Sequence, residues 1–193
     1  MAYDENPPFG RGETYPAESS TDGDGWVGKE YTFPDLSYNT NGNPIRTGRM
    51  NRCRIVRNAS GGTMAACAKK VCLMKNDGTA AQMVGTVMGL STTAGEHGWP
   101  IDEFLPAAGV PANYLFYVVV DGVATCITDS AGDTNISIGH YVVVGTGTDG
   151  NVVGLATAED DADIFTQIHG TVGRALEAVN ATATDILIEV VHR

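Results

Sequence analysis

The chain has 193 residues, of which 42% are hydrophobic and 18% charged, and its net charge is −11 at pH 7. This charge argues against general nucleic-acid binding, which needs a basic face to displace phosphate counterions. No segment approaches 18 consecutive apolar residues, so no membrane-spanning helix is predicted, and residues 1–30 contain no apolar run typical of a secretory signal. The 24 glycines and the low charged fraction favour short strands and tight turns over long helices.

Residues 1–50 differ in composition from the rest of the chain. They hold five of the eight prolines and seven of the fourteen aromatic residues, and they sustain no helical or strand periodicity. Disordered tails are usually poor in aromatic residues, so we interpret this segment as an extended arm that lays its rings on a surface. That surface is a neighbouring subunit, a different protein or the chain's own body, and we favour a partner. The predicted organisation is an arm, residues 1–50, followed by a β-rich body, residues 51–193.

Positive charge is concentrated where the arm meets the body. Residues 36–76 contain eight Lys or Arg and no Asp or Glu, whereas only two basic residues follow residue 76. Such a run forms a solvated face, a patch that docks on an acidic partner or a direct contact with DNA, and the first is the commonest.

The first half of the body is predicted to contain short strands separated by turns. A strand is expected at 53–57, followed by a turn at 58–62, where Asn and Gly tolerate positive φ. Residues 64–74 are apolar around a Lys pair and fit a strand or a helical turn. A further strand is expected at 81–90, and residues 91–113 are expected to form a long loop with one helical turn near 101–105.

A β-hairpin is the clearest local prediction. Asp121 and Gly122 separate two β-branched runs, 114–120 and 123–128. Asp-Gly between such runs is typical of a type I′ turn, so the two runs are predicted to pair through it.

A second hairpin is predicted from residues 136–144 and 151–157, joined by the sequence GTGTDG. This glycine-rich loop looks like a phosphate-binding loop, but such a site requires a helix after the loop and here a strand follows. The loop is therefore predicted to be a hairpin turn. Residues 185–192 are predicted to form a final strand, apolar on both faces and therefore central in its sheet. Short strands with hairpin links indicate a small β-barrel or sandwich of antiparallel strands.

The four cysteines are predicted to be buried free thiols. Cys67 and Cys72 are separated by four residues, which is not the spacing of a zinc ribbon.

The remaining ligand-forming residues indicate neither a metal site nor catalysis. The four histidines are not paired at helical or strand spacing with another His or Cys, and the acidic run Asp160, Asp161 and Asp163 lacks the terminal Glu of a calcium loop. We therefore predict no metal, no cofactor and no enzymatic activity. An enzyme would require a pocket that joins His140 or His169 to carboxylates.

Residues 139–192 carry a resemblance to a known family. They read GHYVVVGTGTDGNVVGLAT and, after a polar stretch, HGTVGRALEAVNATATDILIEVVH. This succession of apolar strand, Asp-Gly turn, apolar strand, Gly-x-Ala-Leu-Glu-Ala, polar turn and final apolar strand resembles the capsid decoration (cement) proteins of tailed double-stranded DNA bacteriophages. The resemblance runs from residue 53 to residue 191. It implies that residues 173–179 form a strand despite their helical propensity, and that the stretch near 160–167 is an insertion.

The resemblance also implies a function. It suggests a virion structural protein, made in the host cytoplasm, that binds the outer capsid surface between subunits of the major capsid protein and stabilises the shell. It further suggests a homo-oligomer, with a trimer favoured. The expected binding residues are the aromatic residues of the arm and a basic collar: Phe9, Tyr15, Trp26, Tyr31, Phe33, Tyr38, Arg46, Arg49 and Arg52. If so, removal of residues 2–45 should leave the body folded and abolish capsid binding.

An alternative is a head-fibre or tail-associated module that binds host-surface glycans, with exposed aromatic rings stacked on sugars. The two functions differ in where the rings lie, because capsid binding covers them and glycan binding leaves them open to solvent.

Overall fold

The computed structural model describes residues 6–17, 25–38, 40–41, 43–74, 86–92, 98–129, 135–155, 170–180 and 184–190. Within these ranges the secondary structure consists of strands, with no helix, so the predicted all-β fold is confirmed. The strands are β1 (Tyr15–Pro16), β2 (Glu30–Tyr38), β3 (Pro44–Asn58), β4 (Val71–Met74), β5 (Thr86–Leu90), β6 (Gly98–Pro100), β7 (Tyr114–Ile127), β8 (Tyr141–Val144), β9 (Val152–Gly154), β10 (Thr171–Ala175) and β11 (Asp185–Val190). No membrane-spanning helix is present in the described ranges.

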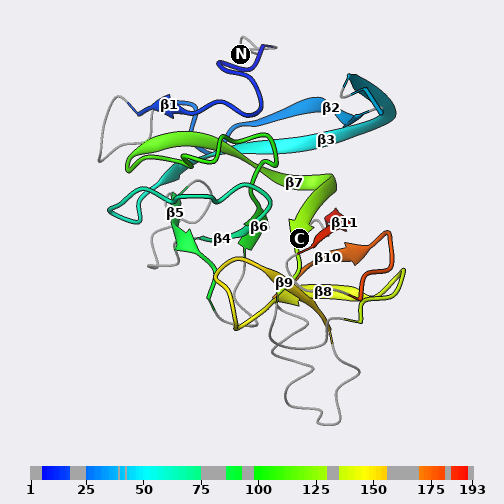
Figure 1. Cartoon of the computed structure of the whole chain (residues 1–193). Coiled ribbons are helices and arrows are strands. Elements are labelled where there is room, and N and C mark those ends of the chain that lie inside the picture. The colour runs from blue at the N-terminus through cyan, green and yellow to red at the C-terminus, as the bar shows by residue number, and fades with distance from the viewer. Residues whose placement is uncertain are drawn as a thin grey trace.

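The strands form one mixed sheet that does not close on itself. Its order is β6-β4-β5-β3-β7-β11-β10-β8-β9, with β1 paired to β7 and β2 paired to β3. Figure 1 shows β2, β3 and β7 in the upper part of the molecule and β8 to β11 in the lower part. The open order fits a sandwich and corrects the alternative of a barrel. The pairing of β3 with β5 is parallel, whereas the sequence predicted antiparallel strands.

The predicted hairpin at Asp121 and Gly122 is wrong, because β7 runs through both residues as one strand. Asp121 pairs with Arg52 of β3, whereas Gly122 pairs with Val190 of β11. The dipeptide is therefore the point at which β7 exchanges one neighbour for another. Gly122 has a φ of +102°, and this conformation, which L side chains rarely adopt, allows the strand to bend there.

Residues 91–113 also differ from the prediction. They contain β6, which pairs with β4, and residues 101–105 form a bridge and a turn instead of a helical turn. Ile101 bridges to Val118, and the Leu105 N–H donates to the Asp102 carbonyl at 3.4 Å. The bridge fixes an extended backbone at Ile101, so a helical turn cannot begin there.

Several predictions in the second half of the chain are confirmed. β8 and β9 form the hairpin around GTGTDG. The strand predicted at 173–179 is confirmed only over residues 173–175, because β10 ends at Ala175 and a bend follows at 176–177. β11 is central, between β7 and β10, although only one of its faces is buried, since Asp185 and Glu189 are exposed. Residues 81–85 of one predicted strand and the predicted insertion at 160–167 lie outside the described ranges.

All four cysteines are free and buried, as predicted. Burial raises the pKa of the Cys53 and Cys72 thiols to about 12, and it raises the pKa of Cys67 and Cys126 as well. The reactive thiolates of Cys53 and Cys72 are therefore almost absent at pH 8, and burial shields the other two thiols from reagents as well. We expect a maleimide reagent to label no cysteine of the native protein in the time in which it labels all four in denaturant, as measured by intact mass. Labelling of one cysteine in the native state at the denatured rate would contradict this burial.

Candidate docking surface

The aromatic residues of the N-terminal segment pack around Tyr117 of β7. The ring centroid of Phe9 lies 4.7 Å from that of Tyr117, and those of Phe33 and Tyr31 lie 5.1 and 6.5 Å from it. The Tyr117 hydroxyl donates a hydrogen bond to the Phe9 carbonyl at 3.2 Å. Phe9 and Tyr31 are only 8% exposed. Of the three surfaces that the sequence left open, the structure shows these rings on the chain's own body.

Tyr15 and Trp26 extend this cluster toward the surface. The Tyr15 ring lies 6.1 Å from Phe9 and 5.3 Å from Trp26, and Tyr15 pairs with Leu115 through β1. Trp26 is partly buried against the core, whereas Tyr15 is exposed. Tyr38 ends β2, but its side chain lies outside what the structure describes.

A buried ion pair that the sequence did not predict holds the N-terminal segment to the body. Asp102 Oδ1 accepts hydrogen bonds from Nε and Nη2 of Arg11 at 3.0 and 2.8 Å, and its Oδ2 accepts one from the Gly12 N–H at 2.7 Å. The Arg11 guanidinium also lies over the Phe104 ring, 4.6 Å from its centroid. The side chains of Arg11 and Asp102 are 8% and 0% exposed. Burial alone would lower the pKa of Arg11, but the Asp102 carboxylate raises it above its ordinary value.

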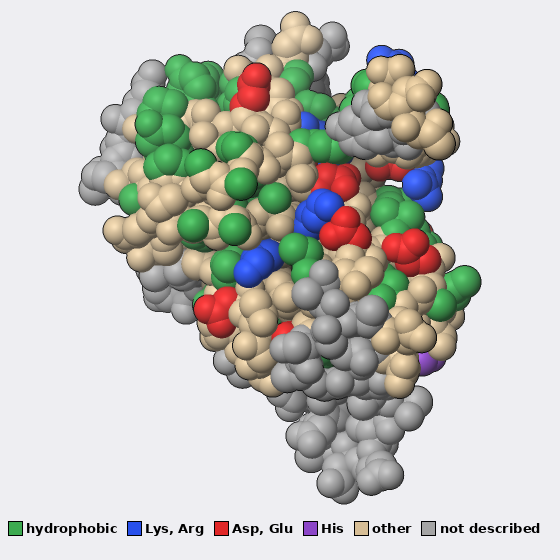
Figure 2. Space-filling view, viewed as in Figure 1, with side chains coloured by type: hydrophobic (Ala, Val, Ile, Leu, Met, Phe, Trp, Pro, Cys, Tyr) green, Lys and Arg blue, Asp and Glu red, His purple; other side chains and the backbone are tan. Residues whose placement is uncertain are grey.

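The outer half of the β2–β3 hairpin projects from the body. The first seven residues of β3, from Pro44 to Met50, are all exposed, whereas the residues from Cys53 onward enter the core. Figure 1 shows this hairpin curving away at the upper right, and Figure 2 shows it as a projection separated from the body by a hollow. Ile45 and Met50 on the projection are 47% and 55% exposed.

Asp35 fixes a bulge at the base of this projection. The β2–β3 register shifts between Pro34 and Leu36, where Asp35 stands opposite the segment from Thr47 to Arg49. Asp35 Oδ2 accepts hydrogen bonds from Thr47 Oγ1 at 2.7 Å and from Arg49 Nε at 3.1 Å. A bulge bends the bulged strand, so the Asp35 carboxylate holds the hairpin in its curved form.

We expect Asp35→Ala to destabilise the protein by about 1–3 kcal/mol, the cost of leaving hydrogen-bonding groups without their partner. Equilibrium denaturation measures this loss. Asp121→Ala is the control, since Asp121 is exposed and its nearest cation, Arg52, lies 3.8 Å away, and exposed pairs contribute little. Equal stability of the two variants would contradict the role assigned to Asp35.

The predicted basic collar is largely paired within the chain. Arg49 contacts Asp35 at 2.9 Å, and Arg52 lies 3.4 Å from Glu30. Both acids belong to β2 and precede the acid-free stretch at 36–76. Antiparallel pairing places Asp35 opposite the segment that contains Arg49, and it places Glu30 opposite Arg54, diagonally from Arg52. Arg46 is exposed near the end of the projection. The candidate docking residues considered below are therefore Ile45, Arg46 and Met50, which are exposed on the outer half of the hairpin.

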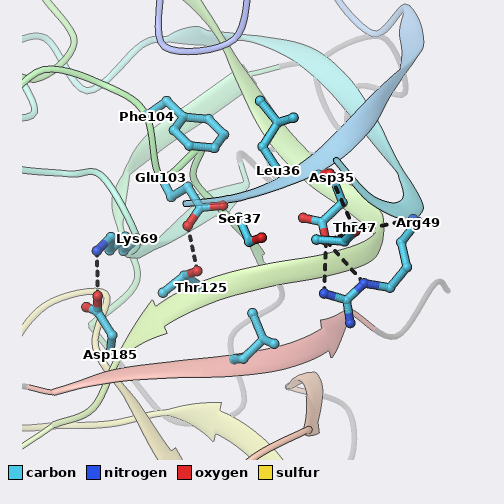
Figure 3. A pocket seen from close by; sticks show the side chains of 11 residues that line it. Asp35, Leu36, Ser37, Thr47, Arg49, Lys69, Glu103, Phe104, Thr125 and Asp185 are labelled. Atoms are coloured by element: carbon cyan, nitrogen blue, oxygen red, sulfur yellow. Dashed lines mark hydrogen bonds and ion pairs between the residues drawn. The ribbon is translucent and has the colours of Figure 1, made fainter. Parts of the chain in front are cut away.

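A cleft of about 400 Å³ lies between the hairpin and the ends of β7 and β11. Figure 3 shows Asp35, Thr47 and Arg49 on the hairpin side and Lys69, Glu103 and Asp185 on the other. Lys69 pairs with Asp185 at 2.6 Å, and Glu103 accepts a hydrogen bond from Thr125 at 2.5 Å. Burial raises the pKa of Glu103.

No histidine is among the described residues that line this cleft. His140 is exposed in the turn before β8, and His169 lies outside the described ranges. The described residues contain no group of three or more His, Cys, Asp or Glu placed to hold a metal ion. Asp160, Asp161 and Asp163 lie outside these ranges, so the predicted absence of a metal or cofactor stays a prediction.

Comparisons with known proteins give little further information. No protein-family model matches the sequence, and no curated protein matches it. Among solved structures, the chain is similar to the head fiber gp8.5 N base in bacteriophage phi29, with a TM-score of 0.38 and 15% identity over 72% of this chain and 92% of that one. A similarity at this TM-score and identity assigns neither a fold family nor a function to the chain.

Proposed function

We propose that this protein is a phage virion structural protein that decorates the outer surface of an icosahedral capsid and stabilises it. Support comes first from the resemblance of residues 53–191 to capsid decoration proteins. The structure adds a short two-stranded projection with apolar and basic side chains exposed at its outer half. Such a projection fits a function of association with another protein surface, with no chemical step.

The projecting hairpin is the observation that carries this proposal. Ile45 and Met50 would bury apolar area against the major capsid protein, and Arg46 would contact an acidic group on its surface. Asp35 holds the bend of the hairpin, so little conformational freedom is lost on binding. Repetition over many shell sites would multiply the effect of each weak contact.

Several of the aromatic residues predicted to bind the capsid are less exposed than that function requires. Phe9 and Tyr31 are covered by the chain's own body and offer little surface to a partner. Tyr15, Arg49 and Arg52 retain exposed surface and remain candidate contacts. The alternative of glycan binding needs several open aromatic platforms, and most rings of the N-terminal cluster are partly or fully covered.

Quantitative mass spectrometry of purified virions tests the location. A copy number comparable to that of the shell protein is expected, and absence from the particle would overturn the proposal.

A binding experiment tests the docking residues of the hairpin, with the purified chain added to particles that lack it. Ile45→Asp with Met50→Asp should abolish binding, whereas Ala108→Asp, at an exposed site on the body, should not. Equal binding by both variants would exclude the hairpin as the docking element.

A further inference from the structure

A second exposed apolar site lies away from the hairpin. Ile138 is 69% exposed and Tyr141 is 51% exposed, and Ile138 is the most exposed of the large hydrophobic residues that the structure describes. Ile138 lies in the turn that precedes β8, and Tyr141 begins β8. Figure 1 shows β8 and β10 in the lower part of the molecule, at the end opposite β2 and β3.

The turn that presents Ile138 is fixed by hydrogen bonds to both of its flanks. Ile136 and Val179 exchange backbone hydrogen bonds of 2.7 and 2.8 Å. On the other side of Ile138, the Gly139 N–H donates to the Ala175 carbonyl at 2.8 Å, and Arg174 Nε donates to the Gly139 carbonyl at 3.0 Å. A side chain held on such a turn loses little backbone freedom when it binds. Ile138 is therefore a preorganised apolar anchor.

An open pocket lies at Ser137, the residue that precedes this anchor. It has a volume of about 290 Å³, and it lies between the segment that precedes Ile138 and the segment that follows β10. Its lining residues are Asn135, Ile136, Ser137, Ala178, Val179 and Asn180. An exposed apolar side chain and a cavity thus occur next to one another on the same part of the surface.

Charges of both signs lie on the strands next to β8. Arg174 of β10 pairs laterally with Tyr141 of β8 on one side and with Glu189 of β11 on the other. Directly opposed residues in a sheet point to the same face, and all three are exposed. The row Tyr141, Arg174 and Glu189 therefore presents an apolar, a positive and a negative group in succession.

We propose that this face binds a second copy of the same chain, with Ile138 of each copy inserted into the cavity at Ile136 and Val179 of the other. The face carries an anchor, a cavity and charges of both signs, and such a surface is complementary to itself. In a two-fold contact the same patch meets its own copy, so each interaction is made twice. An unrelated partner would have to supply both a matching cavity and a matching anchor.

This contact produces a dimer and does not depend on the proposed capsid function. The trimer expected from the sequence resemblance would have to use another face. The proposed contact also pairs Arg174 of one copy with Glu189 of the other, which adds an interaction that weakens with salt.

The test is the mass of the full-length protein in solution. Analytical ultracentrifugation over a range of concentrations should show a monomer–dimer equilibrium. Ile138→Asp should weaken the dimer at least about 30-fold, the loss typical of a central anchor residue. Ala178→Trp should weaken it as well, because the indole would fill the cavity while leaving Ile138 in place.

Ile45→Asp is the matched control, since it places the same charge on an exposed isoleucine of the hairpin. It should leave the dimer unchanged. Thermal unfolding of each variant shows whether the fold is retained, and Ala178→Trp provides a second route if Ile138→Asp unfolds. A wild-type chain that stays monomeric at high concentration, or a dimer that persists in both Ile138→Asp and Ala178→Trp, would overturn the proposal.

Discussion

Replacement of Arg11 by Ala is expected to destabilise the protein by about 3–5 kcal/mol, because it leaves a buried carboxylate without its counter-ion. The two Arg11 hydrogen bonds to Asp102 are lost, and no atom of the Asp102 side chain reaches solvent. Equilibrium unfolding in urea or guanidinium measures the difference. The expected loss is a large fraction of the stability of an ordinary domain.

A double substitution separates the ion pair from simple loss of packing. Arg11→Met with Asp102→Leu removes both charges and keeps most of the volume, so it should be much more stable than Arg11→Ala. Arg54→Ala is the control, because it also removes an arginine from an ion pair, and the Arg54–Glu30 pair is more exposed than the Arg11–Asp102 pair. If Arg11→Ala costs no more than Arg54→Ala, the N-terminal segment does not depend on the Asp102 contact.

Truncation of Tyr117 to Ala is the second large effect that we expect, at about 3–5 kcal/mol. Tyr117 is fully buried, and its ring contacts three rings from the N-terminal part of the chain. Its loss leaves a cavity beneath Phe9, Tyr31 and Phe33. Thermal unfolding and denaturant titration would measure this change.

Tyr117→Phe is the conservative control. It keeps the ring and removes only the hydrogen bond to the Phe9 carbonyl, so it should cost about 1 kcal/mol. A Tyr117→Ala variant as stable as Tyr117→Phe would show that the N-terminal rings contribute little to the fold.

These contacts correct the expectation that residues 2–45 can be removed from a folded body. Removal would expose Tyr117, leave Asp102 without Arg11, and take away β2, which pairs with β3 along its length. The boundary assigned at residue 50 also falls inside β3, although the division into arm and body stays a prediction. The composition of the first 50 residues predicted that the segment lays its rings on a surface, but composition does not identify that surface.

Predictions from local pattern succeeded where neighbouring residues determine the structure. The β8–β9 hairpin depends on a turn between two adjacent apolar runs, and both lie within a few residues of one another. Asp121 and Gly122 gave an equally strong local pattern, and it failed. At this point β7 pairs with β3 before the dipeptide and with β11 after it, and both strands are far away in the sequence. The Asn51 side chain of β3 also accepts a hydrogen bond from the Val123 N–H. Tertiary pairing thus outweighed the turn preference.

The docking surface was only partly predictable. The basic stretch indicated β3, the strand on which the proposed docking residues lie, but not the acids of β2 that pair with Arg49 and Arg52. The acid-free stretch was counted from residue 36. It therefore leaves out Glu30 and Asp35, the two acids that contact these arginines from the neighbouring strand. The Arg11–Asp102 pair spans 91 residues of sequence, and no local pattern links its two members.

The path of β7 through the sheet also affects how the chain must fold. β7 pairs with β3 and with β11, and both partners lie many residues away along the chain, one before it and one after. Loop closure must precede these pairings, so proteins dominated by such non-local contacts fold slowly, on the order of milliseconds to seconds. The β2–β3 hairpin is local and can form early. The central strand completes its pairing only when β11 joins it, so closure of the long segment between β7 and β11 should limit the folding rate.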